Sequence, residues 1–142
     1  MTSPVVVDTG PLVAFLNRRD GWHGWARERF EELDAPFETC EAVVAESSFL
    51  LRNLSGGSDA LMALITRRLI VCTFRLDDSA DRVADLMRRY ENVPMSLADA
   101  CLVRMSEQQP AAKILTLDAD FRVYRKLGRQ VIPLISPQLA RR

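Results

Sequence analysis

The segment of residues 4–12, PVVVDTGPL, constrains the fold more than any other part of this sequence. Three consecutive valines predict a strand that is buried on both faces, as in the centre of a parallel sheet. Asp8 follows them directly, so its carboxylate is expected at the carboxyl end of the strand, where α/β proteins bind their ligands. Gly10 and Pro11 then indicate the start of a helix. An alternative interpretation is that Asp8 only caps this helix.

Further apolar runs at 69–74, 113–117 and 131–135 predict additional strands, and 35–39 is a short connection or strand. Helical periodicity fills the chain between them. Proline at position 133 removes a ladder donor, so the last strand is expected at a sheet edge. Alternating strands and helices predict an α/β fold, a three-layer sandwich whose central, mostly parallel sheet carries helices on both faces. No repeat or linker interrupts the pattern, and we expect residues 1–142 to form a single domain.

The composition is that of an ordinary folded protein, with 48% hydrophobic and 27% charged residues. The formal net charge of +0 gives no global electrostatic reason to expect a polyanionic partner, although a local basic surface remains compatible with it. Cys40, Cys72 and Cys101 are far apart in the sequence and are expected to be buried reduced thiols.

His23 is the single histidine, so a multi-histidine zinc site is excluded and any metal centre must use oxygen ligands. No apolar run approaches the roughly 20 residues that span a bilayer. The Met1 segment also lacks the features of a secretory signal. We therefore expect a cytoplasmic protein without a membrane anchor.

Glu46 lies in a predicted helix over residues 40–54. Apolar residues, among them Phe49 and Leu50, occur three and four positions to either side of it, which predicts that Glu46 projects from the apolar stripe. An ionised glutamate that faces a core is costly unless it is paired or bound to a metal. A functional role is one interpretation, and an ion pair with Arg52 or another arginine is the alternative.

Three aspartates later in the chain also have two interpretations each. Ser96 and Asp99 have capping-box spacing, but a first-turn acid at this edge of the sheet would also point toward the Asp8 crevice. Asp118 repeats the position of Asp8, because it ends the apolar run 114–117, and Asp120 follows two residues later. Turn capping is the alternative for both.

Convergence of these acids would require a cation. Two unit charges 4 Å apart repel by about 4 kcal/mol at an effective dielectric of 20. Carboxylate and water ligands favour Mg²⁺ or Mn²⁺ over zinc. Two such ions can activate water and stabilise both oxygens of an in-line phosphoryl displacement.

Four segments that span nearly the whole chain together resemble the PIN domain, in particular the VapC-type toxins: 7–14 (VDTGPLVA), 44–51 (VAESSFLL), 95–100 (MSLADA) and 115–121 (LTLDADF). The resemblance implies a metal-dependent endoribonuclease site on an α/β sandwich. By motif position it implies catalytic, metal-binding acids at Asp8, Glu46, Asp99 and Asp118, with Asp8 and Asp99 the firmest metal ligands. Thr9 and Thr116 would be polar supports, and Asp120 would hold a metal through water or cap the turn.

The resemblance further implies Mg²⁺-dependent or Mn²⁺-dependent hydrolysis of RNA phosphodiester bonds by activated water. It also implies a homodimer and, for the toxin of a type II toxin-antitoxin pair, a cognate antitoxin whose tail enters the acidic groove. Two related readings stay open, an RNA-processing nuclease without an antitoxin and a non-catalytic RNA-binding module.

Two other classes fit less well. A haloacid-dehalogenase-like phosphatase requires D-x-D after the first strand, where this sequence has Asp8, Thr9 and Gly10. A signalling receiver requires a lysine after a late strand, whereas Lys113 precedes its strand.

Overall fold

The computed structural model of the chain describes residues 3–137. Its centre is a five-stranded sheet with the strand order β3-β2-β1-β4-β7. Every neighbouring pair in this sheet is parallel. The strands are β1 (Val5–Val7), β2 (Phe37–Thr39), β3 (Ile70–Cys72), β4 (Lys113–Leu115) and β7 (Leu134–Ile135).

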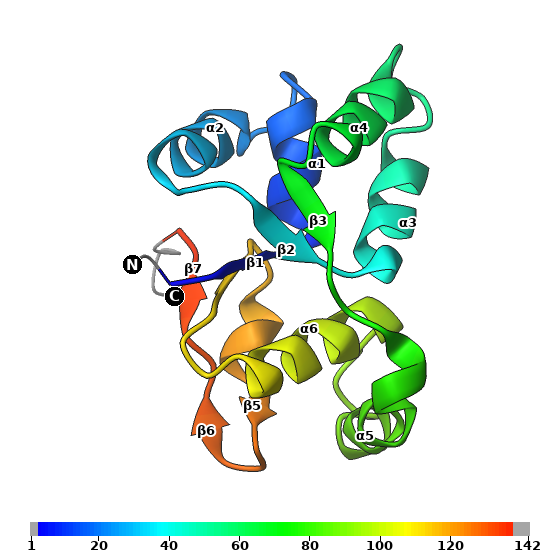
Figure 1. Cartoon of the computed structure of the whole chain (residues 1–142), viewed down its shortest axis with the longest axis vertical. Helices are drawn as coiled ribbons and strands as arrows, with labels where there is room; N and C mark the ends of the chain where they lie inside the picture. The colour runs from blue at the N-terminus through cyan, green and yellow to red at the C-terminus, as the bar shows by residue number, and fades with distance from the viewer. Residues whose placement is uncertain (1–2, 138–142) are drawn as a thin grey trace.

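Helices cover both faces of the sheet, as Figure 1 shows. One layer holds α1 (Thr9–Leu16), α2 (His23–Glu32), α3 (Glu41–Leu50) and α4 (Gly57–Thr66). The opposite layer holds α5 (Leu76–Arg89) and α6 (Leu97–Gln108), together with the 3₁₀ turn η1 (Ala119–Arg122) and the antiparallel hairpin of β5 (Arg125–Lys126) and β6 (Gln130–Val131). The predicted α/β sandwich with a central parallel sheet is confirmed.

The valine strand β1 lies in the middle of the sheet, between β2 and β4. Val6 and Val7 are fully buried, as a strand covered by helices on both faces requires. Val7 is in register with Leu115 of β4, and the backbone N–H of Asp8 donates to the Leu115 carbonyl at 2.9 Å. The carboxyl ends of β1 and β4 therefore meet at one edge, with Asp8 beside Thr116.

The C-terminal part of the sequence differs from its prediction. The run 131–135 does not form one strand, because residues 130–131 pair with β5 and only Leu134–Ile135 joins the sheet as β7. The edge position expected for this strand is correct, and Ile114 N donates to the Pro133 carbonyl at 2.9 Å. The helix predicted over 40–54 ends at Leu50, and a turn follows.

The burial of the cysteines agrees only in part with the prediction. Cys40 and Cys101 are buried, as predicted, but Cys72 is exposed. The prediction for Cys72 was wrong because β3 is an edge strand and Cys72 is its last residue.

Within residues 3–137, no helix has both the length and the apolar character that crossing a bilayer would require.

Candidate active site

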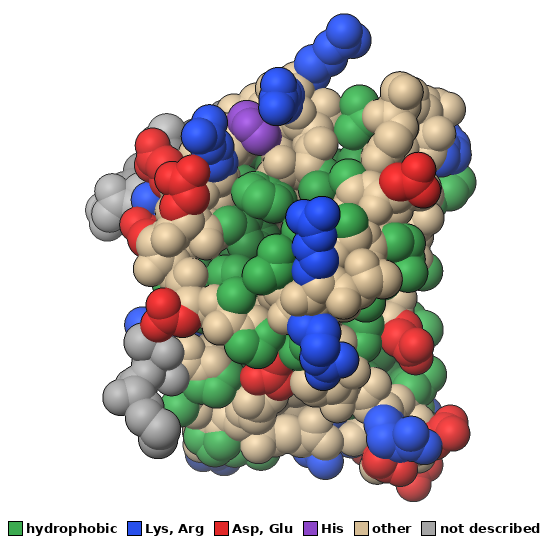
Figure 2. Space-filling view, turned by 45° about the horizontal axis from the view of Figure 1, so that its top comes forward, with side chains coloured by type: hydrophobic (Ala, Val, Ile, Leu, Met, Phe, Trp, Pro, Cys, Tyr) green, Lys and Arg blue, Asp and Glu red, His purple; other side chains and the backbone are tan. Residues whose placement is uncertain are grey.

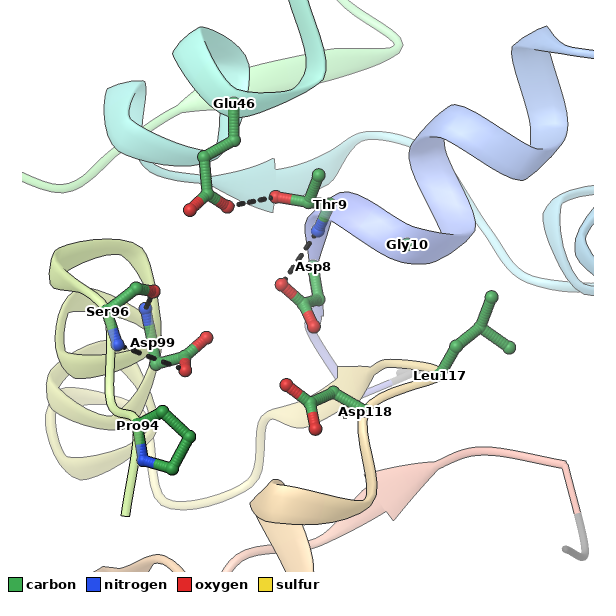
Figure 3. Close-up of a pocket in the computed structure, with 9 residues that line it drawn as sticks. All are labelled: Asp8, Thr9, Gly10, Glu46, Pro94, Ser96, Asp99, Leu117 and Asp118. Atoms are coloured by element: carbon green, nitrogen blue, oxygen red, sulfur yellow. Dashed lines mark hydrogen bonds between the residues drawn. The ribbon is translucent and has the colours of Figure 1, made fainter. Parts of the chain in front are cut away.

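A cavity of about 440 Å³ opens at the carboxyl ends of β1 and β4. Figure 3 shows Asp8, Asp99 and Asp118 reaching toward the same space from three different elements, with Glu46 on the α3 side. The structure thus brings together the four acids that the sequence singled out, although they are up to 110 positions apart. The cavity is lined by Asp8, Thr9, Gly10, Glu46, Pro94, Ser96, Asp99, Leu117 and Asp118.

A second hollow, of about 120 Å³, has a different character. Figure 2 shows apolar side chains gathered in a depression on the face that carries α2 and α4. This lining offers no carboxylate for acid–base chemistry or cation binding, whereas four acids line the cavity at β1 and β4. The acidic cavity is therefore the candidate active site. The apolar hollow is lined by Phe15, Phe30, Ala35, Phe37, Leu64, Leu69 and Ile70.

Asp8 is only 6% exposed and has hydrogen bonds to both carboxylate oxygens. Its Oδ1 accepts from Thr9 N at 2.7 Å, and its Oδ2 accepts from Thr116 Oγ1 at 2.7 Å. Burial raises the pKa of Asp8 to about 7; the Thr116 and Thr9 hydrogen bonds oppose this rise, and the charges of Asp99 and Asp118 add to it. Asp8 therefore caps α1 and also carries a carboxylate that is costly to ionise without a nearby cation.

Asp99 shows both of the arrangements that the sequence left open. It forms the capping box, in which Asp99 N donates to Ser96 Oγ at 3.0 Å and Ser96 N donates to Asp99 Oδ2 at 3.3 Å. It also lines the cavity while remaining only 8% exposed. Burial raises the pKa of Asp99; hydrogen bonds from Ser96 and Tyr124 oppose the rise, and the Asp118 charge adds to it.

Glu46 reaches the cavity, but not for the reason inferred from the sequence. Phe49 is 61% exposed and Leu50 is 56% exposed, whereas the buried face of α3 carries Val43 and Ser47. Glu46 itself is exposed, so the interpretation that it faces a core was wrong.

The partner of Glu46 is a hydroxyl on α1, which packs against α3. Thr9 Oγ1 donates to Glu46 Oε1 at 2.8 Å. The alternative ion pair with Arg52 is not formed, because the Arg52 guanidinium donates to the Phe49 carbonyl and stacks on its ring. Thr9 and Glu46 thus form one wall of the cavity.

Thr116 connects the two acids that follow strands. It is fully buried, donates to Asp8, and accepts from Asp118 N at 2.9 Å. Asp118 is exposed and caps η1, since its Oδ1 accepts from Asp120 N at 2.9 Å. Asp120 is half-buried and is not part of the cavity lining, and burial, followed by the Asp118 charge, raises its pKa.

Sequence reasoning missed Tyr124, whose hydroxyl donates to Asp99 Oδ2 at 3.1 Å. Burial raises the pKa of the Tyr124 phenol, and the Asp99 charge raises it further, so Tyr124 stays a hydrogen-bond donor. No pattern in the sequence indicates this contact, because it joins α6 to the segment after η1.

Whether the four acids can bind a cation depends on how many of their carboxylate oxygens are free of hydrogen bonds. Within residues 3–137, no three His, Cys, Asp or Glu side chains are grouped so that they could hold a metal ion. However, the hydrogen bonds from described residues to Glu46, Asp99 and Asp118 reach one carboxylate oxygen of each and leave the other free. Mg²⁺ is usually bound by one or two carboxylates and several waters. The oxygen-only donor set and the open cavity therefore fit such an ion.

The comparisons with known proteins agree with this architecture. Residues 5–127 match the family model described as PIN domain. The chain belongs to the PIN domain family. This confirms, at the level of the family, the resemblance that the four sequence segments carry.

A solved structure shares the fold. VapC20 from Mycobacterium tuberculosis, described as a sarcin-ricin loop cleaving toxin, superimposes with a TM-score of 0.75 at 20% identity. The match covers 84% of this chain and 93% of VapC20. No protein with a curated description matches this sequence. The structural match therefore shows a common fold.

Proposed function

We propose that this protein is a metal-dependent endoribonuclease that hydrolyses RNA phosphodiester bonds, and that it is the toxin of a type II toxin-antitoxin pair. The observation that carries the proposal is the convergence of Asp8, Glu46, Asp99 and Asp118 on one cavity at the carboxyl edge of the sheet. Membership of the PIN domain family supports a nuclease. The description of VapC20 as a sarcin-ricin loop cleaving toxin supports the toxin role.

In this proposal Asp8 and Asp99, assisted by Asp118 and Glu46, hold Mg²⁺ or Mn²⁺. A bound divalent ion would supply activation of water and neutralisation of phosphate charge. Thr9 and Thr116 orient Glu46 and Asp8 through the hydrogen bonds described above. Asp120 donates its backbone N–H to Asp118 and so holds that carboxylate at the rim.

The charge of the cavity is the physical reason for requiring a cation. The lining contains four acids and no lysine or arginine. An RNA phosphodiester is itself an anion, so its approach to four carboxylates would be repulsive without a positive charge between them. Buried Asp8 adds to this requirement, because its ionised form lacks the hydration that an exposed carboxylate has.

We further propose that the partners are the RNA substrate, a second copy of the chain in a homodimer, and a cognate antitoxin, all in the cytoplasm. An arginine from an antitoxin tail would form charge-assisted hydrogen bonds with the same carboxylates. Such a contact would block the cavity and keep the nuclease inactive.

Cleavage of total cellular RNA by the purified protein tests the proposal. We expect cleavage with Mg²⁺ or Mn²⁺ and a loss of at least about 100-fold in Asp8→Asn and Asp99→Asn, equivalent to about 2.7 kcal/mol of barrier. Glu31→Gln, which changes an exposed acid on α2, is the matched control and should cleave normally.

The possible outcomes separate the alternative functions. Equal cleavage by the aspartate variants, or full activity in excess chelator, would contradict the assignment. RNA binding that survives loss of the acids, without any cleavage, would favour a binding module. Cleavage without toxicity in cells, and without a neighbouring antitoxin gene, would favour an RNA-processing nuclease.

A further inference from the structure

Tyr124 lies directly behind the candidate active site without lining it. Its side chain is fully buried, and its hydroxyl donates to Asp99 Oδ2 at 3.1 Å. Asp99 belongs to the first turn of α6, whereas Tyr124 follows η1, so this hydrogen bond joins two separate elements.

The position of this hydroxyl is fixed by packing. The Tyr124 ring makes edge-to-face contacts with Tyr90, at a centroid distance of 5.1 Å, and with Phe121, at 5.2 Å. The backbone is held as well, because Tyr124 N donates to the Asp120 carbonyl. A ring held on both sides gives its hydroxyl little freedom to move.

The hydrogen bonds to Asp99 determine which of its oxygens is available. Tyr124 Oη and Ser96 N both contact Oδ2, and no hydrogen bond from residues 3–137 reaches Oδ1. The terminal torsion of an aspartate is broad, so one bond of 3.3 Å from Ser96 would fix it poorly. The Tyr124 bond therefore sets the direction in which Oδ1 faces the cavity.

Tyr124 also connects Asp99 to a second acid of the site. Asp118 caps η1, and Tyr124 follows the same turn with its N–H on the Asp120 carbonyl. The hydroxyl bond to Asp99 thus ties the segment that carries Asp118 to the N-terminus of α6.

We propose that Tyr124 is a positioning residue that fixes the Asp99 carboxylate relative to Asp118, and thereby increases the affinity of the site for a divalent cation. This inference rests on the proposed function, because it assumes that the acids bind such an ion. Hydrogen-bond partners of metal ligands typically change metal affinity 10-fold to 100-fold when they are removed.

Titration of the protein with Mn²⁺, in which electron paramagnetic resonance measures the free ion, tests the inference. Tyr124→Phe removes only the hydroxyl and should weaken Mn²⁺ binding about 10-fold. Tyr90→Phe is the matched control, because it removes a hydroxyl from the same aromatic cluster that contacts Arg125 N and no acid. It should bind Mn²⁺ within about 2-fold of wild type, well below the 10-fold lower end of that range.

RNA cleavage gives a second readout. At limiting Mn²⁺, Tyr124→Phe should be slower than wild type, and saturating Mn²⁺ should restore most of its rate. Far-ultraviolet circular dichroism at the titration temperature checks that both phenylalanine variants are folded. If Tyr124→Phe does not fold, Tyr124→His, whose ring can still donate a hydrogen bond, should fold and bind Mn²⁺ better than Tyr124→Leu.

The outcomes distinguish this inference from the proposed function. If wild type binds Mn²⁺ and Tyr124→Phe binds it equally well, the positioning role is overturned while the proposed function stands. An equal loss in Tyr90→Phe would also overturn it, because the effect would then be one of packing. If wild type binds no Mn²⁺, the metal-dependent function fails and this inference fails with it.

Discussion

Two buried carboxylates in this protein, Glu107 on α6 and Asp8 after β1, have nearly equal exposure and opposite surroundings. Glu107 is 7% exposed, and Asp8 is 6% exposed. Glu107 accepts two hydrogen bonds from Arg82, at 2.9 and 2.6 Å, and one from Leu127 N at 2.7 Å. Arg104 Nη1 donates to Glu107 Oε1 at 3.4 Å, the same oxygen that Arg82 Nε contacts. Asp8 has only neutral donors and faces Asp99 and Asp118.

These surroundings shift the pKa values of the two acids in opposite directions. Burial alone would raise the pKa of Glu107, but the hydrogen bonds from Arg82 and Leu127 and the charge of Arg82 outweigh it, so the pKa lies below its usual value. At Asp8, burial dominates and raises the pKa to about 7. Burial of an acid therefore does not identify a functional site. The sign of the surrounding charges is the better guide, because arginines balance the charge of Glu107 whereas Asp8 has other acids beside it.

The largest effect on the free energy of unfolding is expected at Glu107, whose negative charge is balanced by arginines. Glu107→Gln removes the charge that holds Arg82, Arg104 and the β5–β6 hairpin together, and should lower the free energy of unfolding by about 3 kcal/mol. Urea unfolding at pH 7 measures this. The exposed pair of Arg27 and Glu31 supplies the control, since Glu31→Gln should cost less than about 1 kcal/mol.

The pH dependence sharpens this prediction. Because the pKa of folded Glu107 lies below 4.5, its stabilisation is present above that pH and is lost as the pH falls through the folded value. The difference between wild type and Glu107→Gln should therefore shrink in acid. A constant difference from pH 7 to pH 3 would contradict the ion-pair account.

Asp8 should behave in the opposite way. Its pKa rises from 3.8 in the unfolded chain to about 7, so the folded protein binds this proton more tightly and loses stability as the pH increases between these values. In chelator at pH 8, Asp8→Asn should be more stable than wild type by on the order of 2 kcal/mol. Asparagine also remains a good helix cap.

Urea unfolding at pH 8 and pH 5 checks the Asp8 prediction. The advantage of Asp8→Asn should be smaller at pH 5, where the wild-type carboxyl is largely protonated. A variant that is less stable than wild type at pH 8 would show that the Thr9 and Thr116 hydrogen bonds outweigh the cost of burial.

The smallest effects are expected from the two threonines that support the acids. Thr116→Val deprives buried Asp8 of a donor and should cost about 1–2 kcal/mol of unfolding free energy. Thr9→Val deprives only the exposed Glu46, where water can replace the hydroxyl, and should cost less than about 1 kcal/mol. Thermal unfolding of both variants compares them, and a reversed order would contradict the role assigned to burial.

Part of this site could be predicted from the sequence, because short sequence patterns indicate where a strand ends or a helix begins. Asp8 and Asp118 each follow a short apolar run, and carboxyl ends of neighbouring parallel strands meet at one edge. Asp99 was recognisable through its capping box with Ser96. Glu46 was selected by helix periodicity, yet it lies on an exposed face and reaches the cavity through Thr9.

The remaining features depend on contacts between distant elements. Glu107 lies in the polar run SEQQ before Pro110, which is typical of a surface. Its carboxylate is nevertheless covered by Arg82, Arg104 and the Leu127 backbone, which come from distant elements or from the adjacent turn of the helix. Tyr124 meets Asp99 through the packing of η1 against α6. The β5–β6 hairpin has two residues in each strand, too few for a periodic signal. The extent of one domain over residues 1–142 stays a prediction.

The most direct test of the central claim is the thermal unfolding midpoint of the metal-free protein at pH 8, measured with and without Mg²⁺. A cation that binds only the folded state stabilises it by mass action, by about 2.7 kcal/mol at 100 times its dissociation constant. We expect a higher midpoint for wild type in Mg²⁺, a much smaller increase for Asp99→Asn, and the same increase as wild type for Glu107→Gln. An equal increase in wild type and Asp99→Asn, or none in wild type, would contradict the central claim.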